Sequence, residues 1–494
     1  MKRTFLRILP VAAALLLATS CSKDSDNDTS IATTPGNNLP AQEQIVEQPK
    51  SHAIPFSITV GKDIETLSKA TLQDGTTTTQ VFEAGDVLVL KNGETEVAEL
   101  TLAEGGDGQT TATFSGTLAT DGLTSGATEI SVTLKNDGNG NAGTALTAPQ
   151  PASTLAEAFQ KYGYWTSSFT YTEGETPTIS LTQNTAFVKV DLPFHGTKVT
   201  FTINGTTTTQ YLNGDEIIAI PNGTAIKSQL LGIDKTVTIN SENNKVVLNI
   251  KNRTTPTDCI AGVFSVAADK QIFFSKGNLQ YHCKNKQWTF ASNQYDYIGS
   301  GNEQISDSYE GYIDLFGWGM WLSGQDPTKS SVANSDYLSS VVSGEFSGTS
   351  AIGSEWATLS TAEWQYLFQT RANAAQLYGH GKVGDANGMI ILPDGWVAPE
   401  GTSFIPGNSD WANTYTDEQW TAMESSGAVF LPAAGRREGT TVAAAGSYGD
   451  YWSSSAYGED NAVRVHFHSG TLTLEDVYYR RRYYGFSVRL VRSL

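Results

Sequence analysis

The chain has 494 residues, of which 39% are hydrophobic and 17% are charged, and its formal net charge at pH 7 is −19. This acidic balance excludes nucleic acid as an expected partner, because phosphate binding needs a basic face. The composition is instead typical of a folded extracellular protein, whose net charge favours solubility outside the cell.

The N-terminus has the pattern of an export signal. Lys2, Arg3 and Arg7 precede a short apolar stretch, Ile8 to Ala18, which ends in small residues directly before Cys21. This stretch is too short to cross a bilayer as a helix, and no later segment has the eighteen or more apolar residues that spanning needs. We therefore expect a signal peptide at residues 1–20 and no transmembrane helix.

The residues around Cys21 resemble a bacterial lipobox, Ala18-Thr19-Ser20-Cys21, although leucine is usual where Ala18 stands. The resemblance implies that the Cys21 thiol is diacylated, and two lipid chains supply the two signals that stable anchoring requires. The SKDSDNDTS that follows resembles the acidic tract that sends lipoproteins of gut and oral anaerobes to the outer face. We expect a lipid-anchored protein on the outer membrane, facing the cell exterior. The alternative is an ordinary signal peptide with an incidental cysteine.

Residues 21–53 are rich in Asp, Asn, Ser, Thr, Pro and Gln, so they predict a flexible tether. From residue 54 to 253, short runs alternate apolar and polar residues between Asp-Gly, Asn-Gly and Gly-Gly turns, a pattern typical of β-sandwiches. DGTTTTQ from Asp74 and NGTTTTQ from Asn204 predict hairpin turns. One helix is expected around Leu155 to Lys161.

This β region resembles the fimbrillin family, the pilus subunits of such anaerobes, in FEAGDVLVL, ATFSGTLA and TAFVKVDLPF. The resemblance implies two tandem transthyretin-like β-sandwiches, 54–182 and 183–253, and pilus subunits as partners. One departure is the absence of arginine between Arg7 and Arg253. Arginine-directed maturation of the first domain is therefore not expected, which suits an anchor, a tip or a stand-alone protein better than a stalk subunit.

A composition shift at Thr254 to Cys259 marks the expected start of another domain, in which Trp and Tyr become dense. Two helices are predicted there by capping boxes, Ser360 with Glu363 and Thr416 with Gln419. Hydrophobic staples accompany both boxes, and a glycine follows the second helix; these residues are Leu359, Trp364, Tyr415, Trp420 and Gly427. The pattern predicts an α+β domain.

Residues 260–494 resemble the C-type-lectin-like paralogous domain of Bacteroides-type surface lipoproteins. The motifs that carry the resemblance are GVFSV, FSKGNLQY, QYDYIG, IDLFGWG, WATLSTAEWQYLF, GMIILPDGW, FLPAAGRREGT, YWSSSAY and YYGFSVRLVR. The layout is also similar to proteins diversified by retroelements, whose last strands and loops vary while the frame stays fixed. The resemblance implies a recognition domain and no particular chemistry.

Apolar and polar residues alternate in NAVRVHFHSGTLTLED, and this pattern predicts where a ligand binds. Val463, Val465 and Phe467 share one face, which we expect to be core, while the other face is expected to be free. Trp452 and Phe486 are expected in the core. The polar and aromatic residues of this stretch predict a recognition surface, made of Tyr457, Glu459, Asp460, Arg464, His466, His468, Thr471, Thr473, Glu475, Asp476, Tyr478, Arg480 and Arg481.

Two alternatives remain open, on the role of these polar residues and on the state of the cysteines. The polar residues could only solvate an outer strand, and His466 with His468 lack a third ligand at fitting spacing, so no metal is expected. Cys259 and Cys283 could form a disulfide or remain two separate thiols. No phosphate loop, Gly-x-Ser-x-Gly elbow or HEXXH motif occurs, so we expect neither an enzyme nor a cofactor. Formylglycine-generating enzymes share the lectin-like fold but need a redox-active cysteine arrangement, and the calcium-dependent sugar-binding triplets are missing.

The sequence therefore predicts a mostly β, surface-anchored adhesin or receptor that binds a protein or glycan of a host or bacterial surface through its C-terminal domain. The alternatives are a structural pilus or cell-surface component without its own ligand, or a non-catalytic glycan-binding accessory.

Overall fold

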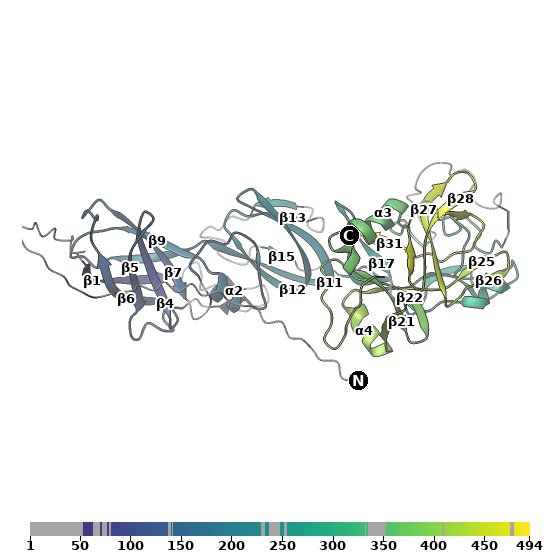
Figure 1. Ribbon diagram of the computed structural model, residues 1–494, viewed down its shortest axis with the longest axis horizontal. Helices are drawn as coiled ribbons and strands as arrows, with labels where there is room; N and C mark the ends of the chain where they lie inside the picture. Colours follow the sequence, from purple (N-terminus) through teal and green to yellow (C-terminus); the bar gives the residue numbers. More distant parts are fainter. Residues whose placement is uncertain are drawn as a thin grey trace, which may run out of the picture. The chain divides into compact units, whose positions relative to one another are not determined.

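The computed structural model describes residues 53–62, 70–71, 77–78, 81–136, 140, 142–228, 233–236, 248–250, 254–330, 332–333, 352–407, 410–474 and 479–494. The chain divides into two units, Met1–Lys50 and Ser51–Leu494, and all described residues belong to the second. The predicted signal peptide, Cys21 and the tether up to residue 52 lie outside the described residues. The described part is mostly β (Figure 1), and none of its helices has the length and apolar character needed to cross a membrane.

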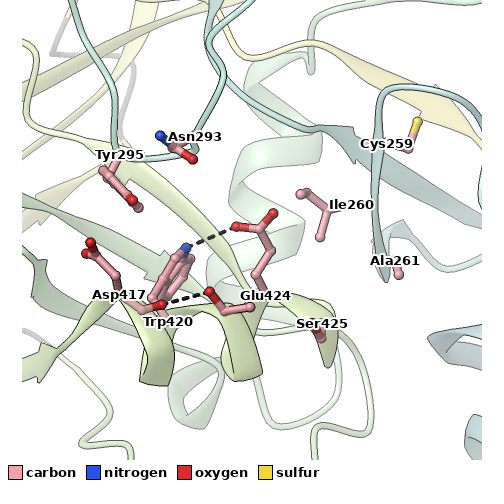
Figure 2. A pocket seen from close by; sticks show the side chains of 10 residues that line it. Cys259, Ile260, Ala261, Asn293, Tyr295, Asp417, Trp420, Glu424 and Ser425 are labelled. Atoms are coloured by element: carbon pink, nitrogen blue, oxygen red, sulfur yellow. Dashed lines mark hydrogen bonds between the residues drawn. The ribbon is translucent and has the colours of Figure 1, made fainter.

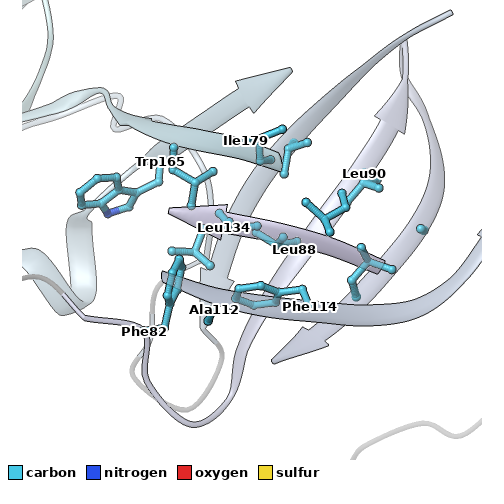
Figure 3. Close-up of a cluster of buried hydrophobic side chains, with 14 of the residues drawn as sticks. Phe82, Leu88, Leu90, Ala112, Phe114, Leu134, Trp165 and Ile179 are labelled. Atoms are coloured by element: carbon cyan, nitrogen blue, oxygen red, sulfur yellow. The ribbon is translucent and has the colours of Figure 1, made fainter. Parts of the chain in front are cut away.

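Strands with one buried face close the first part of the described chain into a barrel, in the order β1-β10-β9-β7-β4-β5-β6. The side chains that face inward are apolar, among them Leu88, Leu90 and Phe114 (Figure 3). The strands are β1 (Ala53–Lys62), β4 (Asp86–Asn92), β5 (Thr95–Leu102), β6 (Thr111–Ala119), β7 (Glu129–Asn136), β9 (Trp165–Thr170) and β10 (Thr178–Gln183). The short strands β2 (Ala70–Thr71) and β3 (Thr77–Thr78) pair in a separate two-stranded sheet.

The barrel differs from the sandwich of two separate sheets that the sequence predicted. Strand β1 pairs in parallel with β10 along one edge and antiparallel with β6 along the other, so hydrogen bonding continues around the ring. The predicted helix is present as α2 (Leu155–Tyr162), where Thr154 accepts a bond from the Glu157 backbone N–H. Its Phe159 packs 4.3 Å from Phe187, measured between ring centroids.

The second sheet is built on a long hairpin of β11 and β12, drawn in teal in Figure 1. Asn204 and Gly205 form its two-residue turn with φ of 48° and 80°, which confirms the hairpin turn predicted there. The turn predicted at Asp74 lies outside the described residues. The strands are β8 (Gln150–Ala152), β11 (Thr185–Ile203), β12 (Thr206–Pro221), β13 (Ala225–Ser228), β14 (Ile233–Thr236), β15 (Leu248–Ile250), β16 (Cys259–Ala267), β17 (Lys270–Ser275) and β31 (Val491–Ser493).

This sheet continues across the domain boundary that the sequence suggested at Thr254 to Cys259. His195 of β11 pairs with Gly262 of β16, and β17 pairs with the last strand, β31. The packing is close, because a Cβ added to Gly196 would lie 2.6 Å from the Val263 carbonyl oxygen. The middle sheet and the C-terminal region therefore share a core, in which Val263 packs with Phe194.

A buried polar network holds this junction. The Gln271 amide accepts a bond from the Lys198 backbone N–H (2.9 Å) and donates to the Gly196 carbonyl (2.9 Å) and the Asp394 carboxylate (3.0 Å). The other Asp394 oxygen lies 3.1 Å from the Arg371 guanidinium. Since both members of this ion pair are buried, the bonds that surround them are needed to offset their desolvation.

The C-terminal region consists of short sheets and helices around several apolar clusters. Both predicted capping boxes are present, at Ser360 with Glu363 and at Thr416 with Gln419. The elements are β18 (Leu279–His282), β19 (Gln287–Phe290), η2 (Gly299–Gln304), β20 (Tyr312–Ile313), α3 (Thr361–Gln365), η4 (Tyr366–Thr370), η5 (Ala374–Gln376), β21 (Tyr378–Val383), β22 (Ala386–Ile391), β23 (Asn413–Tyr415), α4 (Asp417–Ser425), β24 (Val429–Pro432), β25 (Arg436–Glu438), β26 (Thr441–Ala443), β27 (Tyr448–Tyr457), β28 (Asn461–His468), β29 (Thr471–Thr473) and β30 (Tyr479–Arg481).

Candidate binding site

Most of the predicted binding residues lie on or beside one small sheet, drawn in yellow in Figure 1, in which β28 pairs with β27 on one edge and with β29 and β30 on the other. The inner face of β28 is buried as predicted, because Val465 and Phe467 pack in one cluster with Tyr451. Trp452 and Phe486 are also buried, 4.4 Å apart between ring centroids, but in a different cluster on the other side of the sheet.

The expectation that Arg464 and His466 point to solvent is wrong. Arg464 is 1% exposed and His466 is 7% exposed. The alternation itself holds, but the second face of β28 is covered as well: the Arg464 guanidinium lies over the Phe486 ring, 5.2 Å from its centroid. Asp450, on the neighbouring strand, forms an ion pair with Arg464 and lies 2.8 Å from the His466 Nδ1 atom. A buried charge needs such a partner, which assigns Arg464 a structural role.

His466 is uncharged at neutral pH. Burial lowers the pKa of its imidazole to about 3, and the positive charge of Arg464 adds to the effect. The nearby Asp450 carboxylate would act in the opposite direction, but Arg464 already balances its charge. His466 therefore contributes hydrogen-bonding atoms and packing to this face, and no charge.

The accessible predicted residues lie at the two ends of β28. At one end, the turn after β27 exposes Tyr457, Glu459 and Asp460, and the Asp460 carboxylate is 3.8 Å from exposed Arg481. Half-buried Arg480 stands opposite Ala462 at the same end, whereas His468, Thr471 and Thr473 are half-buried at the other end. The structure therefore separates the predicted site into two groups. Glu475, Asp476 and Tyr478 lie outside the described residues.

The end of β28 at His468 is extended by residues that the sequence reasoning did not select. Tyr448 stands opposite His468, and their rings are 5.1 Å apart and tilted by 30°. The Arg436 guanidinium lies over the Tyr448 ring, 5.9 Å from its centroid. Arg436 lies in FLPAAGRREGT, which the sequence analysis used only as a motif of the resemblance, and Tyr448 precedes YWSSSAY. Pairing the two predicted strands in register would have placed Tyr448 opposite His468. The position of Arg436 over the Tyr448 ring depends on tertiary packing, which the sequence pattern does not show.

A buried histidine, His380, contacts the backbone of β29 at this end of the sheet. His380 of β21 is fully buried, and its Nε2 atom lies 3.1 Å from the Thr471 carbonyl oxygen. Its ring packs against Trp411 and Phe467, and burial lowers its pKa, so it stays neutral. Because His380 and Phe467 fix β29 from below, the hydroxyls of Thr471 and Thr473 are held on a rigid frame.

A concave site lies between β16 and α4 (Figure 2), with a volume of about 320 Å³. Asp417, Thr421 and Glu424 line it from one face of α4, and Tyr295 faces them. The Trp420 indole N–H donates to Glu424 at 3.1 Å. The sequence reasoning used this helix only for its caps, although the i, i+4, i+7 spacing of these polar residues places them on one face.

Cys259, at the edge of that cavity, and Cys283 are free thiols, so the alternative of two separate cysteines is the one the structure has. Burial raises the pKa of the Cys259 thiol to about 12 and raises that of Cys283 as well. A thiol that stays protonated is a poor nucleophile and a poor metal ligand. Among the described residues, no three His, Cys, Asp or Glu side chains are placed to hold a metal ion.

Comparisons with known proteins do not assign a family. No family model matches the chain, and no curated protein matches it. A solved structure, described as the Bacillus anthracis TIE protein, aligns with 48% of this chain at 11% identity and a TM-score of 0.14. The alignment spans 40% of that protein's length.

Proposed function

We propose that this protein is a lipid-anchored adhesin or receptor on the outer face of the outer membrane, and that its C-terminal region binds a protein or glycan of another surface. The observation that carries the proposal is the end of the β27–β29 face near His468. There Tyr448, His468, Thr471 and Thr473 present aromatic and hydrogen-bonding groups, half-exposed, on a sheet whose other face is a packed core. Accessible polar groups on a rigid frame are typical of recognition surfaces.

The finer architecture belongs to the same proposal. We assign residues 260–494 to a C-type-lectin-like domain, supported by the two capped helices and by the pairing of its early strand β17 with its last strand β31. The middle sheet is proposed to derive from a transthyretin-like, fimbrillin-type unit, and the barrel from a second such unit in which the two layers are joined. A terminal position in a pilus would suit the absence of arginine between Arg7 and Arg253.

A non-catalytic role is part of the proposal. The cysteine chemistry that formylglycine-generating enzymes need would require a reactive thiolate, whereas burial holds the pKa of Cys259 at about 12. The second candidate function is a structural surface component without a ligand. It would give no binding role to the accessible residues near His468.

The binding proposal is tested with a matched pair of histidine variants. The intact protein is screened against cells, glycans and surface proteins, and the strongest ligand is measured with His468→Ala and His282→Ala. His282 is a suitable control because it is also half-buried and packs on a tyrosine, Tyr312, at 4.4 Å. We expect His468→Ala to weaken binding about 30-fold, the effect of a hot spot of about 2 kcal/mol, with an unchanged melting temperature. Equal binding by both variants would favour the structural role.

The location is tested separately by protease shaving of intact cells and by Cys21→Ala. We expect the wild-type protein to be shaved and the variant to be released from the membrane fraction. A Cys21→Ala protein that stays membrane-bound would contradict the lipid anchor.

A further inference from the structure

The accessible end of the β27–β29 face carries positive charge in a strongly acidic protein. We call the residues Arg436, Tyr448, His466, His468, Thr471 and Thr473 the cationic patch; they come from β25, β27, β28 and β29. The Tyr448 ring is 5.1 Å from His468 and 5.4 Å from His466, and Arg436 lies over the same ring. Thr473 and Thr471 stand opposite His466 and His468 in the strand register. These side chains therefore form one continuous group.

The charge of the patch comes from Arg436. Within the described residues, no carboxylate lies within ion-pair distance of Arg436, whose guanidinium instead stacks on Tyr448. Arg464 also lies on this face, but buried Asp450 balances it. A guanidinium stacked on an aromatic ring keeps its planar fork of N–H donors, which match a carboxylate or sulfate. The net charge of the whole chain, −19, opposes the approach of an anion. Selectivity of this site for an anion therefore comes from the local position of the Arg436 guanidinium.

The remaining groups of the patch favour a sugar over a protein as the carrier of that anion. Protein interfaces are anchored by large apolar or aromatic side chains that become buried. The large hydrophobic side chains that are exposed in the described part of the chain are Tyr312, Val332, Val397, Ile405 and Tyr457, and none belongs to the patch. The patch instead offers the half-buried ring of Tyr448, the imidazole of His468 and the hydroxyls of Thr471 and Thr473, a set that suits a pyranose.

We propose that the cationic patch binds an anionic glycan, with Arg436 pairing with a carboxylate or sulfate of the sugar and His468, Thr471 and Thr473 bonding its hydroxyls. This inference rests on the proposed function, because it names the ligand class of the same face. Asp410, which accepts a hydrogen bond from Ser469 beside His468, stands at the border of the patch and opposes the binding of an anion.

The test measures binding of the intact protein to polygalacturonate, dextran sulfate, dextran and polyglutamate at low and high salt. We expect one or both acidic glycans to bind, more weakly as salt rises, and dextran and polyglutamate not to bind. The two acidic glycans distinguish a carboxylate from a sulfate as the recognised group. Polyglutamate binding as tight as that of the glycans would overturn the proposal in favour of an acidic protein partner.

Arg436→Gln is expected to weaken acidic-glycan binding about 10-fold to 100-fold, because a hydrogen bond to a charged group contributes about 1.5 to 3 kcal/mol. Arg492→Gln is the matched control, since Arg492 of β31 is also half-buried and lies over an aromatic ring, Trp356, 5.4 Å from its centroid. Arg436→Lys keeps the charge without the planar fork and should fall between the two, and Asp410→Asn should bind more tightly. Thermal melting checks that each variant is folded.

Equal losses in Arg436→Gln and Arg492→Gln would show a non-specific charge effect and overturn the proposal, as would acidic-glycan binding that Arg436→Gln leaves unchanged. These failures are distinguishable from failure of the proposed function. If His468→Ala abolishes binding to another ligand while Arg436→Gln does not, the face still binds but the anionic-glycan assignment is wrong. If neither variant affects any ligand, both proposals fail.

Discussion

The barrel and the C-terminal region differ in the kind of side chain that they bury. Inside the barrel, the buried cluster is apolar, and the buried pair of Asp86 and Asn136 stands where β4 begins and β7 ends, joined by a 2.8 Å hydrogen bond. The C-terminal region instead buries many charged side chains between its apolar clusters. They are Asp314, Arg371, Asp394, Arg437, Asp450, Arg464, Arg482 and Arg489.

The difference follows from how each region satisfies its backbone. In a closed ring of strands, each strand has a partner on both edges, so few carbonyls need another donor. The C-terminal region is rich in loops, and buried arginines donate to loop carbonyls: Arg437 to Leu315 and Lys329, and Arg482 to Gly458. A guanidinium has five donors and can serve several carbonyls at once. Buried charge is therefore a structural requirement of the loop-rich frame.

The largest effect is expected from breaking the buried pair at the junction. Asp394→Ala removes the acceptor of Arg371, Ser265 and Gln271 and leaves the Arg371 charge buried and unpaired. We expect a loss of about 3 to 5 kcal/mol in the free energy of unfolding, measured by urea denaturation. Asp385→Ala is the control, because that carboxylate is exposed beside Lys382, and it should change little. Similar effects of the two variants would contradict a structural role for buried charge.

A smaller, pH-dependent effect is expected from Asp314. Burial raises the pKa of this carboxyl from 3.8 to about 6, although Asn302 and the Ile298 N–H bond to it. The protonated acid is favoured in the folded state, so its stabilising contribution is complete below about pH 4 and is lost as the pH rises to about 6. The difference of about two pKa units corresponds to about 3 kcal/mol.

Asp314→Asn isolates this contribution, because asparagine does not titrate. We expect the wild-type protein to gain about 2.4 kcal/mol relative to the variant when the pH falls from 7 to 4, measured by denaturant unfolding at each pH. A constant difference between the two proteins across this range would show that Asp314 titrates normally. Other carboxylates cancel in the comparison, since both proteins contain them.

The smallest effects come from a pair of methionine variants that compare the two cores directly. Arg437→Met keeps an apolar body of similar length but removes the donors to Leu315 and Lys329, so we expect a loss of about 2 kcal/mol or more. Leu134→Met in the barrel conserves volume and should cost less than about 1.5 kcal/mol. Urea denaturation measures both. If the barrel variant is the more destabilised, the contrast between the cores is wrong.

Local features of the fold could be predicted because they depend on neighbours in the chain. The Ser360 and Thr416 capping boxes, the Asn204-Gly205 turn and α2 are each set by a few consecutive residues. Alternation also identified the buried inner face of β28. It could not show that the ring of barrel strands closes, because closure depends on the pairing of β1 with β10, far apart in the sequence.

The sequence by itself determined that Arg464, His466 and His468 share one face of a strand, since a β-strand places alternate side chains on the same side. Only the tertiary structure decided which of them a ligand could reach. Phe486 and Trp452 cover the part of the face at Arg464, while Tyr448 and Arg436 leave the end at His468 accessible. The physical reason is that alternation determines the face of the strand on which a side chain lies. The exposure of that side chain depends on whether another segment packs against the same face.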